Sequence, residues 1–226
     1  MASIFDLPTK VADAFYLLVH DHRRGKAFLD GQVTDLSIGA AVLAELFWAG
    51  LIVLDSDHAV AIAPSVGVPR DLVQHAMLEE IDWERDHRPL ADWMPVLGPL
   101  ARPMIAQRLY RQRFHTPVRI PHLPVVGRLY LTATPRWVPE NPVKAEAPRL
   151  HLGNLISSAL AWERYELLLL ALVCATGAQH RAFPFIAGHH LERIDHEAMS
   201  RLSDPLPELL RQLKHTVKGL VAAGRH

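Results

Sequence analysis

The run of apolar residues from Leu167 to Ala175 is the feature that most constrains how this chain can fold. It is far shorter than the ~20 residues that span a bilayer, and Glu163 and Glu166 crowd its start. We therefore expect a helix that is buried on most sides and that needs other helices around it. The helical patterns near the N-terminus are its obvious neighbours, so one domain over residues 1–226 is predicted.

Apolar residues recur at helical spacing along most of the chain. The second expected helix has Thr34 as its N-cap and Gly50 just after its end. In its middle, Gly39, Ala40 and Ala41 remove side-chain bulk, which predicts that another helix passes close by. The expected helices cover 8–20, 35–49, 70–81, 103–114, 151–162, 162–176, 189–202 and 206–223.

Short apolar runs between these helices indicate two pairs of strands. The first pair covers 51–54 and 59–63, and the second covers 118–120 and 128–132. The proline-rich segment 134–149 is expected to be an extended connector, because proline is unfavourable inside a helix. Together these patterns predict a mainly α fold with two short β-hairpins.

The composition argues against several classes of protein. The chain carries 24 basic and 24 acidic side chains, whereas a dedicated nucleic-acid-binding protein more often has a basic excess. Any anion-binding surface must therefore come from local clustering. The 14 histidines make the net charge sensitive to mild acid.

The cysteine count and the N-terminus favour the cytoplasm. Cys174 is the only cysteine, which excludes an intrachain disulfide and a cysteine-built zinc site and fits a reducing compartment. The opening MASIFDLPTKVADAF lacks the basic and continuous apolar regions of a signal peptide. A cytoplasmic protein is the resulting expectation.

Few motifs in the sequence point to catalysis. It contains no G-x-G-x-x-G, no Walker-type loop and no G-x-S-x-G. His189, Glu192 and His196 fall at i, i+3 and i+7, so one helix face could present all three to a transition metal. An amphipathic helix whose polar face carries histidines explains the same pattern, and we favour that interpretation. We predict no cofactor and no metal.

Basic residues form the clusters with the clearest chemistry. Arg102 directly precedes Pro103, and the residue before a proline is pushed out of the α region, which predicts Arg102 near the N-cap of the helix at 103–114. The free N–H groups of a helix start favour phosphate or carboxylate. Arg108 and Arg111 lie at i and i+3 on the predicted polar face of that helix. A further patch lies in the first loop, at Arg23, Arg24 and Lys26. We expect these clusters to form an anion-binding surface.

Several segments resemble the Golgi phosphoprotein 3 family. LPTKVADAFYLLVHDHRRGKAFLDG and VLAELFWAGLIVL are similar to the family's leucine-rich helix, charged turn and following helix and strand. The likeness continues through IAQRLYRQRFHTPVRI, GRLYLTATP and LLLLALVCATG, so it covers most of the chain in the family's order. The many histidines and prolines resemble a bacterial, actinobacterial-type member. The resemblance implies a single helical-bundle domain with two short β-hairpins, one of them protruding.

The resemblance also implies a function. It indicates a non-enzymatic cytoplasmic adaptor, because eukaryotic members bind phosphatidylinositol 4-phosphate at the membrane surface and recruit cargo glycosyltransferases. It implies head-group binding by Arg102 and the neighbouring basic residues. It also implies that the hairpin near 118–132 is used for self-association, and the apolar residues of that hairpin are Val118, Ile120, Leu129 and Leu131.

The family's head-group pocket is only partly present in this sequence. Its tryptophan falls at Asp30, and an arginine of the next helix falls at Gly39. Of two further basic positions, one falls at Pro99 and the other at Arg102, so only Arg102 keeps its charge. An acid in place of the aromatic side chain would repel a phosphate.

Two alternative functions remain open from the sequence. The helix 35–49 followed by strands at 51–63 is also how many winged-helix DNA-binding modules end. That helix contains Glu45 and no arginine or lysine, whereas a recognition helix needs groups that reach base edges. We therefore predict no nucleic-acid partner. A metalloenzyme centred on the set of His189, Glu192 and His196 is the second alternative.

Overall fold

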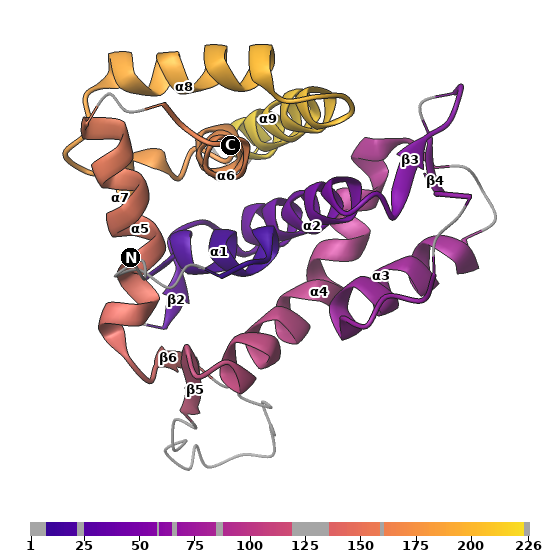
Figure 1. Ribbon diagram of the computed structural model, residues 1–226, viewed down its shortest axis with the longest axis horizontal. Coiled ribbons are helices and arrows are strands. Elements are labelled where there is room, and N and C mark those ends of the chain that lie inside the picture. The colour runs from indigo at the N-terminus through magenta and orange to yellow at the C-terminus, as the bar shows by residue number, and fades with distance from the viewer. Residues whose placement is uncertain are drawn as a thin grey trace.

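The computed structural model describes residues 8–21, 25–57, 59–64, 67–84, 88–118, 136–158 and 161–223. The predicted mainly α class is confirmed (Figure 1). The helices are α1 (Val11–Leu18), α2 (Gly31–Trp48), α3 (Leu72–Trp83), α4 (Leu90–Arg111), α5 (Pro142–Ser157), α6 (Arg164–Ala175), α7 (Gln179–Ala182), α8 (Gly188–Arg201) and α9 (Leu206–Ala223). Antiparallel pairs join β1 (His20–Asp21) to β2 (Lys26–Ala27), β3 (Ile52–Leu54) to β4 (Val60–Ile62) and β5 (His115–Val118) to β6 (Arg136–Pro139).

Helix α2 lies at the centre of the bundle. It packs against α1, α4 and α9, and α6 lies on the same side of it as α9 (Figure 1). The apolar run in α6 is buried from Leu167 to Val173, as predicted. One cluster of buried apolar side chains includes residues of each helix named above. Among the described residues, no helix combines the length and the hydropathy needed to cross a membrane.

Helix α2 begins four residues earlier than predicted. Its N-cap is Asp30, whose carboxylate accepts a hydrogen bond from Gln32 N at 2.9 Å. Thr34, the predicted cap, lies inside the first turn, and its hydroxyl donates to the carbonyl oxygens of Leu29 and Asp30. Aspartate caps a helix at least as well as threonine does, so both Asp30 and Thr34 can cap the start of this helix, and in the structure Asp30 does so.

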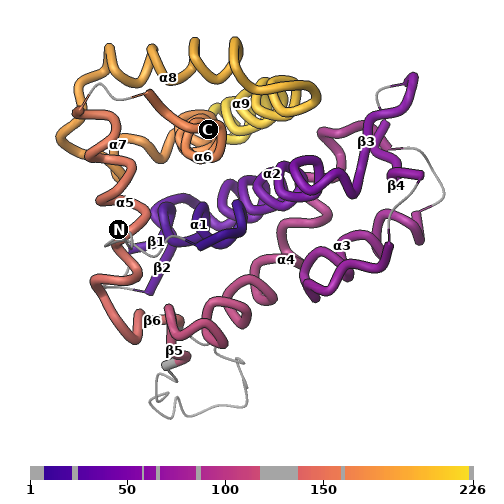
Figure 2. The backbone as a smooth tube through the Cα atoms, in the orientation of Figure 1, coloured from indigo at the N-terminus to yellow at the C-terminus, as the bar shows by residue number. Residues whose placement is uncertain are grey.

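Helix α4 is continuous through three prolines, which contradicts the predicted break near Pro103. Figure 2 shows its backbone running from the β3–β4 hairpin to β5. Pro95, Pro99 and Pro103 are spaced four residues apart and are all exposed, so they share the solvent side of the helix. The carbonyls that lose an N–H partner there can bind water, which limits the cost of each proline.

The predicted close approach of a helix to Gly39 is confirmed. A Cβ atom added at Gly39 would lie 2.0 Å from the carbonyl oxygen of Met94 in α4. A Cβ atom at Gly98 of α4 would lie 1.8 Å from the carbonyl oxygen of Asp35 in α2. Each helix therefore supplies one glycine to a crossing in which the two backbones touch.

The hairpins and the connector differ in part from the prediction. The β3–β4 pair is confirmed, and the β1–β2 pair is a further hairpin that the sequence analysis missed. In the second predicted hairpin, Val118 ends β5, but the partner of β5 is β6 at 136–139. Ile120, Leu129 and Leu131 lie outside the described residues.

The connector predicted at 134–149 is wrong in its second half. Helix α5 begins at Pro142, because Asn141 accepts hydrogen bonds from Val143 N and Lys144 N. Proline suits the first position of a helix, where its missing N–H would have had no partner within the helix. The prolines that indicated an extended segment therefore mark, in part, the start of a helix.

Candidate functional site

Arg108 lies in the interior of the protein, where it contacts three carboxylates. Its Nε atom donates to Oδ1 of Asp13 at 2.8 Å, and its Nη1 atom donates to Oδ1 of Asp71 at 2.7 Å. Its Nη2 atom lies 3.4 Å from Oε2 of Glu45. The Arg108 side chain is only 11% exposed. The prediction that Arg108 shares an exposed polar face with Arg111 is therefore wrong. Arg108 is buried instead, and the three carboxylates around it offset the cost of burying its charge.

The carboxylates of this cluster also bind other groups. Glu45 accepts hydrogen bonds from Ala12 N at 3.1 Å and from Gln74 Nε2 at 3.0 Å. Asp71 is the N-cap of α3 and accepts from the backbone N–H groups of residues 73 and 74. The cluster thus ties α1, α2, α3 and α4 to one guanidinium. We call Asp13, Glu45, Asp71 and Arg108 the buried ion cluster.

The charges of the buried ion cluster do not balance when all its groups are ionised. Burial raises the pKa of the Asp13 carboxyl from 3.8 to about 6, although the neighbouring Arg108 lowers it. Oδ2 of Asp13 is buried and has no hydrogen-bond partner among the described residues. Burial lowers the pKa of the Arg108 guanidinium, but Asp13, Glu45 and Asp71 raise it by more. Arg108 therefore stays charged, whereas burial moves the pKa of Asp13 up to about 6.

Sequence reasoning missed Asp13 and Asp71 and used Glu45 only as an argument against DNA binding. A signal was present, because Asp13 in VADAF and Glu45 in LAELF have apolar neighbours on both sides. A carboxylate at such a position in a buried helix needs a cation or a donor close by. The sequence does not say which of the 24 basic residues supplies it.

We expect Asp13→Asn to remove a pH dependence of stability. Asp13 binds a proton more tightly in the folded chain than in the unfolded chain, so the folded state loses stability as the pH rises from about 4 through about 6. The loss is at most about 3 kcal/mol. Urea unfolding of both proteins between pH 4 and 7 measures it. The stability of the natural chain minus that of the variant should fall over this range, and a constant or rising difference would contradict the assignment.

Arg102 lies inside α4, not at a helix N-terminus. Its Nη1 atom donates to Oδ1 of Asp35 in α2 at 3.0 Å, and its side chain is 39% exposed. An anionic head group would have to compete with this carboxylate. Asp30, at the position of the family's tryptophan, already caps α2. The position aligned with a family arginine, Gly39, lies in the helix crossing, where no side chain fits.

A basic surface forms where α4 ends against β6 and α5. Arg111 and Arg113 are exposed there, and Lys144 of α5 donates to the carbonyl oxygen of residue 112 at 3.1 Å. Lys26 is exposed in β2, and a Cβ atom at its neighbour Gly25 would lie 2.9 Å from the carbonyl oxygen of residue 137. We call Lys26, Arg111, Arg113 and Lys144 the basic face.

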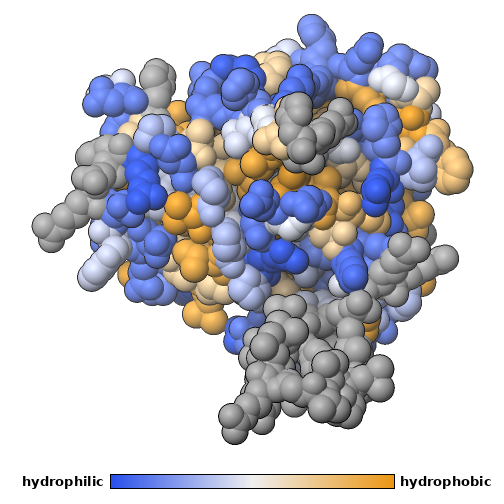
Figure 3. Space-filling view, turned by 180° about the vertical axis from the view of Figure 1, so that it is seen from behind, coloured by the Kyte–Doolittle hydropathy of each residue, from blue (hydrophilic) through white to orange (hydrophobic). Residues whose placement is uncertain are grey.

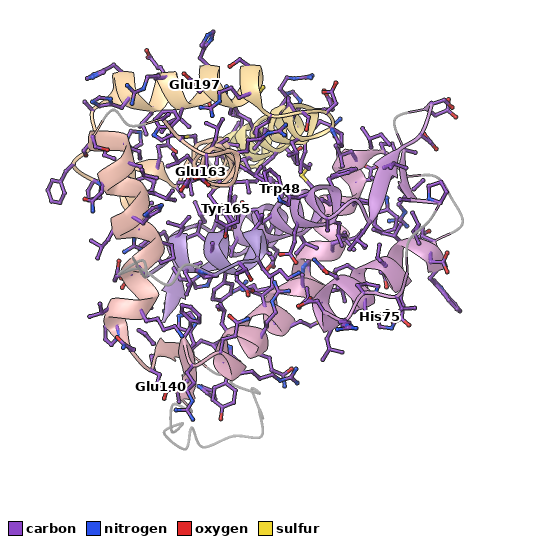
Figure 4. All side chains as sticks on the ribbon, viewed as in Figure 1. Trp48, His75, Glu140, Glu163, Tyr165 and Glu197 are labelled. Atoms are coloured by element: carbon purple, nitrogen blue, oxygen red, sulfur yellow. The ribbon has the colours of Figure 1, made fainter. Side chains whose placement is uncertain are left out.

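Aromatic and apolar side chains border the basic face. The rings of Tyr110 and Trp137 lie 6.2 Å apart, and Tyr110 is 46% exposed. Val143, next to Lys144 in the sequence, is 71% exposed. Figure 4 shows that Glu140 also lies at this end of the molecule, so the face contains at least one carboxylate.

The structure brings together only some of the predicted site residues. Arg102 and Arg111 are nine residues apart in one helix, which places them on opposite sides of it and roughly 14 Å apart along its axis. Arg23 and Arg24 lie outside the described residues. Arg111 and Lys26 belong to the basic face, whereas Arg102 and Arg108 have carboxylate partners elsewhere.

The geometry does not favour the two alternative functions. Helix α2 is buried from Leu36 to Leu46, so it has no free face to enter a DNA groove. In the described part of the chain, no three His, Cys, Asp or Glu side chains are placed together to hold a metal ion, and His189, Glu192 and His196 of α8 are among the residues to which this applies.

The fold and these charges define a mainly α protein with a buried ion cluster and a basic, aromatic-bordered surface. Residues 11–217 match the family Golgi phosphoprotein 3 (GPP34). The chain therefore belongs to the Golgi phosphoprotein 3 family. A comparison with curated proteins found no match.

Proposed function

We propose that this chain is a non-enzymatic, cytoplasmic adaptor whose basic face rests on anionic membrane surfaces. The observation that carries the proposal is the convergence of Lys26, Arg111, Arg113 and Lys144 at one end of α4, beside exposed Tyr110 and Val143. Tyrosine suits a membrane–water interface because it has an apolar ring and a polar tip. Val143, which is exposed next to Lys144, can enter the head-group layer while the charges stay at its surface.

Charge is the main attraction in this proposal. Each lysine or arginine near an anionic membrane contributes about 1 kcal/mol, and salt screens it. On the side of the molecule that Figure 3 shows, hydrophobic residues appear in patches among polar ones, not as one continuous apolar surface. We therefore expect reversible binding that weakens as the salt concentration rises.

The surroundings of Arg102 favour a general anionic surface over a pocket for one head group. Asp35 already neutralises Arg102, and Asp30 adds a second negative charge near the start of α2. At equal surface charge, phosphatidylinositol 4-phosphate should bind this chain no more tightly than phosphatidylserine. A clear preference for phosphatidylinositol 4-phosphate that Arg102→Leu removes would contradict this part of the proposal.

Co-sedimentation with phosphatidylcholine vesicles containing phosphatidylserine, cardiolipin or phosphatidylinositol 4-phosphate tests the basic face. The triple variant Lys26→Glu, Arg111→Glu, Arg113→Glu should bind at least tenfold more weakly than the natural chain at low salt, because three favourable charges become repulsive. The matched control is Arg70→Glu, Arg181→Glu, Lys218→Glu, which changes the net charge equally at exposed positions elsewhere.

The control variant should bind within about threefold of the natural chain, because surface charges farther from the contact than the Debye length, which is roughly 14 Å at 50 mM salt, are largely screened. Equal losses in both triple variants would mean that net charge, not the basic face, determines binding. No binding of the natural chain to any anionic vesicle at 50 mM salt would reject the proposal.

A further inference from the structure

The outer face of α3 carries an exposed tryptophan among acidic side chains. Trp83 is 85% exposed and Leu72 is 58% exposed. Leu72, Ala76, Glu79 and Trp83 follow one another at spacings of four, three and four residues, so they form one stripe along the helix in which Glu79 lies between Ala76 and Trp83. Large apolar side chains that line up in the open are informative, whereas single ones are not.

The opposite face of α3 already has its partners. Val73, Met77, Leu78 and Ile81 are buried, and α3 packs against α4 and β4. The Leu72–Trp83 stripe therefore lies on the face of α3 that neither α4 nor β4 covers. Figure 4 shows His75 at the outer edge of α3, away from the centre of the bundle.

Three acidic residues line the same hollow as Trp83. Glu79 and Glu80 precede Trp83 by four and three residues, which is the spacing of side chains that touch on a helix, and Asp82 is its neighbour in the chain. A hollow of about 840 Å³ is lined by Ala76, Glu79, Glu80, Asp82 and Trp83. His75 Nε2 lies 3.3 Å from Oε1 of Glu79, so a protonated His75 would offset one of these charges.

We propose that this face of α3 binds a basic, amphipathic segment of a partner protein. Apolar side chains of the segment would cover Leu72 and Trp83. Its lysine or arginine side chains would lie against Glu79, Glu80 and Asp82, and one of them would lie over the indole ring, where tryptophan attracts cations most strongly. Tryptophan is also the residue that most often contributes a large share of binding energy at protein interfaces. This site is separate from the basic face and does not depend on membrane binding.

A fluorescein-labelled dodecapeptide that repeats leucine-lysine-lysine-leucine three times is the probe. Its leucines share one side of a helix and its lysines the other. Fluorescence anisotropy without vesicles should show binding at 50 mM salt, weakening at 300 mM. The same peptide with glutamate in place of lysine should bind at least tenfold more weakly, because it is repelled by Glu79, Glu80 and Asp82.

Two variants locate the peptide on α3, and each has a matched control. Trp83→Ala should weaken binding about tenfold or more, whereas Trp48→Ala, at a tryptophan that is 44% exposed on α2, should change it less than twofold. Glu79→Lys with Glu80→Lys should weaken binding by at least tenfold. Glu140→Lys with Glu192→Lys, at exposed sites elsewhere, adds the same charge and should change it less than threefold.

Three results would overturn the proposal. The first is no binding of the lysine peptide at 100 µM protein and 50 mM salt. The second is equal binding by each variant and its control, which would indicate diffuse charge attraction. The third is self-association of the protein alone that Trp83→Ala abolishes in sedimentation velocity, because the face would then bind a second copy of this chain.

Discussion

Gly98→Ala should lower the free energy of unfolding by about 3 kcal/mol or more, and Gly98→Leu should prevent folding. The added Cβ atom would lie 1.8 Å from the carbonyl oxygen of Asp35, and the atom in its way belongs to a backbone, not to a side chain that can turn aside. Helices α2 and α4 would have to separate along the crossing that fills the centre of the bundle. Urea unfolding followed by circular dichroism measures the loss.

Gly219→Ala in α9 is the control for this effect. Gly219 is exposed, and a Cβ atom there meets nothing within 4 Å. Because alanine is the better helix former, this variant should be more stable than the natural chain by up to about 1 kcal/mol. If Gly98→Ala were as stable as Gly219→Ala, the backbones of α2 and α4 could not be in contact.

Arg108→Met should lower the free energy of unfolding by about 3–5 kcal/mol at pH 7, because it leaves buried carboxylates without a cation. The loss should be smaller at pH 5, where Asp13 takes up a proton and one uncompensated charge disappears. Arg111→Met, three residues further along the same helix but exposed, should stay within about 0.5 kcal/mol of the natural chain.

A second substitution separates charge from packing in this prediction. Adding Asp13→Asn to Arg108→Met should recover about 1 kcal/mol or more, because it removes one of the carboxylates that the arginine balanced. If the two changes were simply additive, the arginine would matter for its packing and not for its charge. Equal stability of Arg108→Met and Arg111→Met would reject the buried ion cluster altogether.

The predictions from sequence succeeded where local patterns decide the structure. The predicted bounds of helix α9, 206–223, are the same as those in the structure, because its apolar spacing is regular and Pro205 lies just before it. The crossing at Gly39 was predicted because three small residues in an otherwise bulky helix leave room for a neighbour. These features depend on side-chain size and period, which a single sequence displays.

The predictions that were wrong concern features that depend on how helices far apart in the sequence pack against one another. Pro103 is harmless in α4 because its side of the helix faces solvent, and the proline itself does not reveal this. The burial of Arg108 depends on carboxylates far from it in the sequence: Asp13, Glu45 and Asp71 come from three other elements. Spacing within one helix could not distinguish Arg108 from Arg111, although one is buried and the other is exposed.

The three prolines of α4 also restrict what this protein can touch. Because Pro95, Pro99 and Pro103 have no N–H, the carbonyl oxygens of Ala91, Pro95 and Pro99 lack their usual helical donors and can accept hydrogen bonds from water instead. A dry protein interface or the interior of a bilayer would strip that water away at a cost of several kcal/mol per carbonyl. We therefore expect this side of α4 to remain in contact with solvent. The membrane contact proposed above is then expected to involve only the last turn of α4, where the basic face begins.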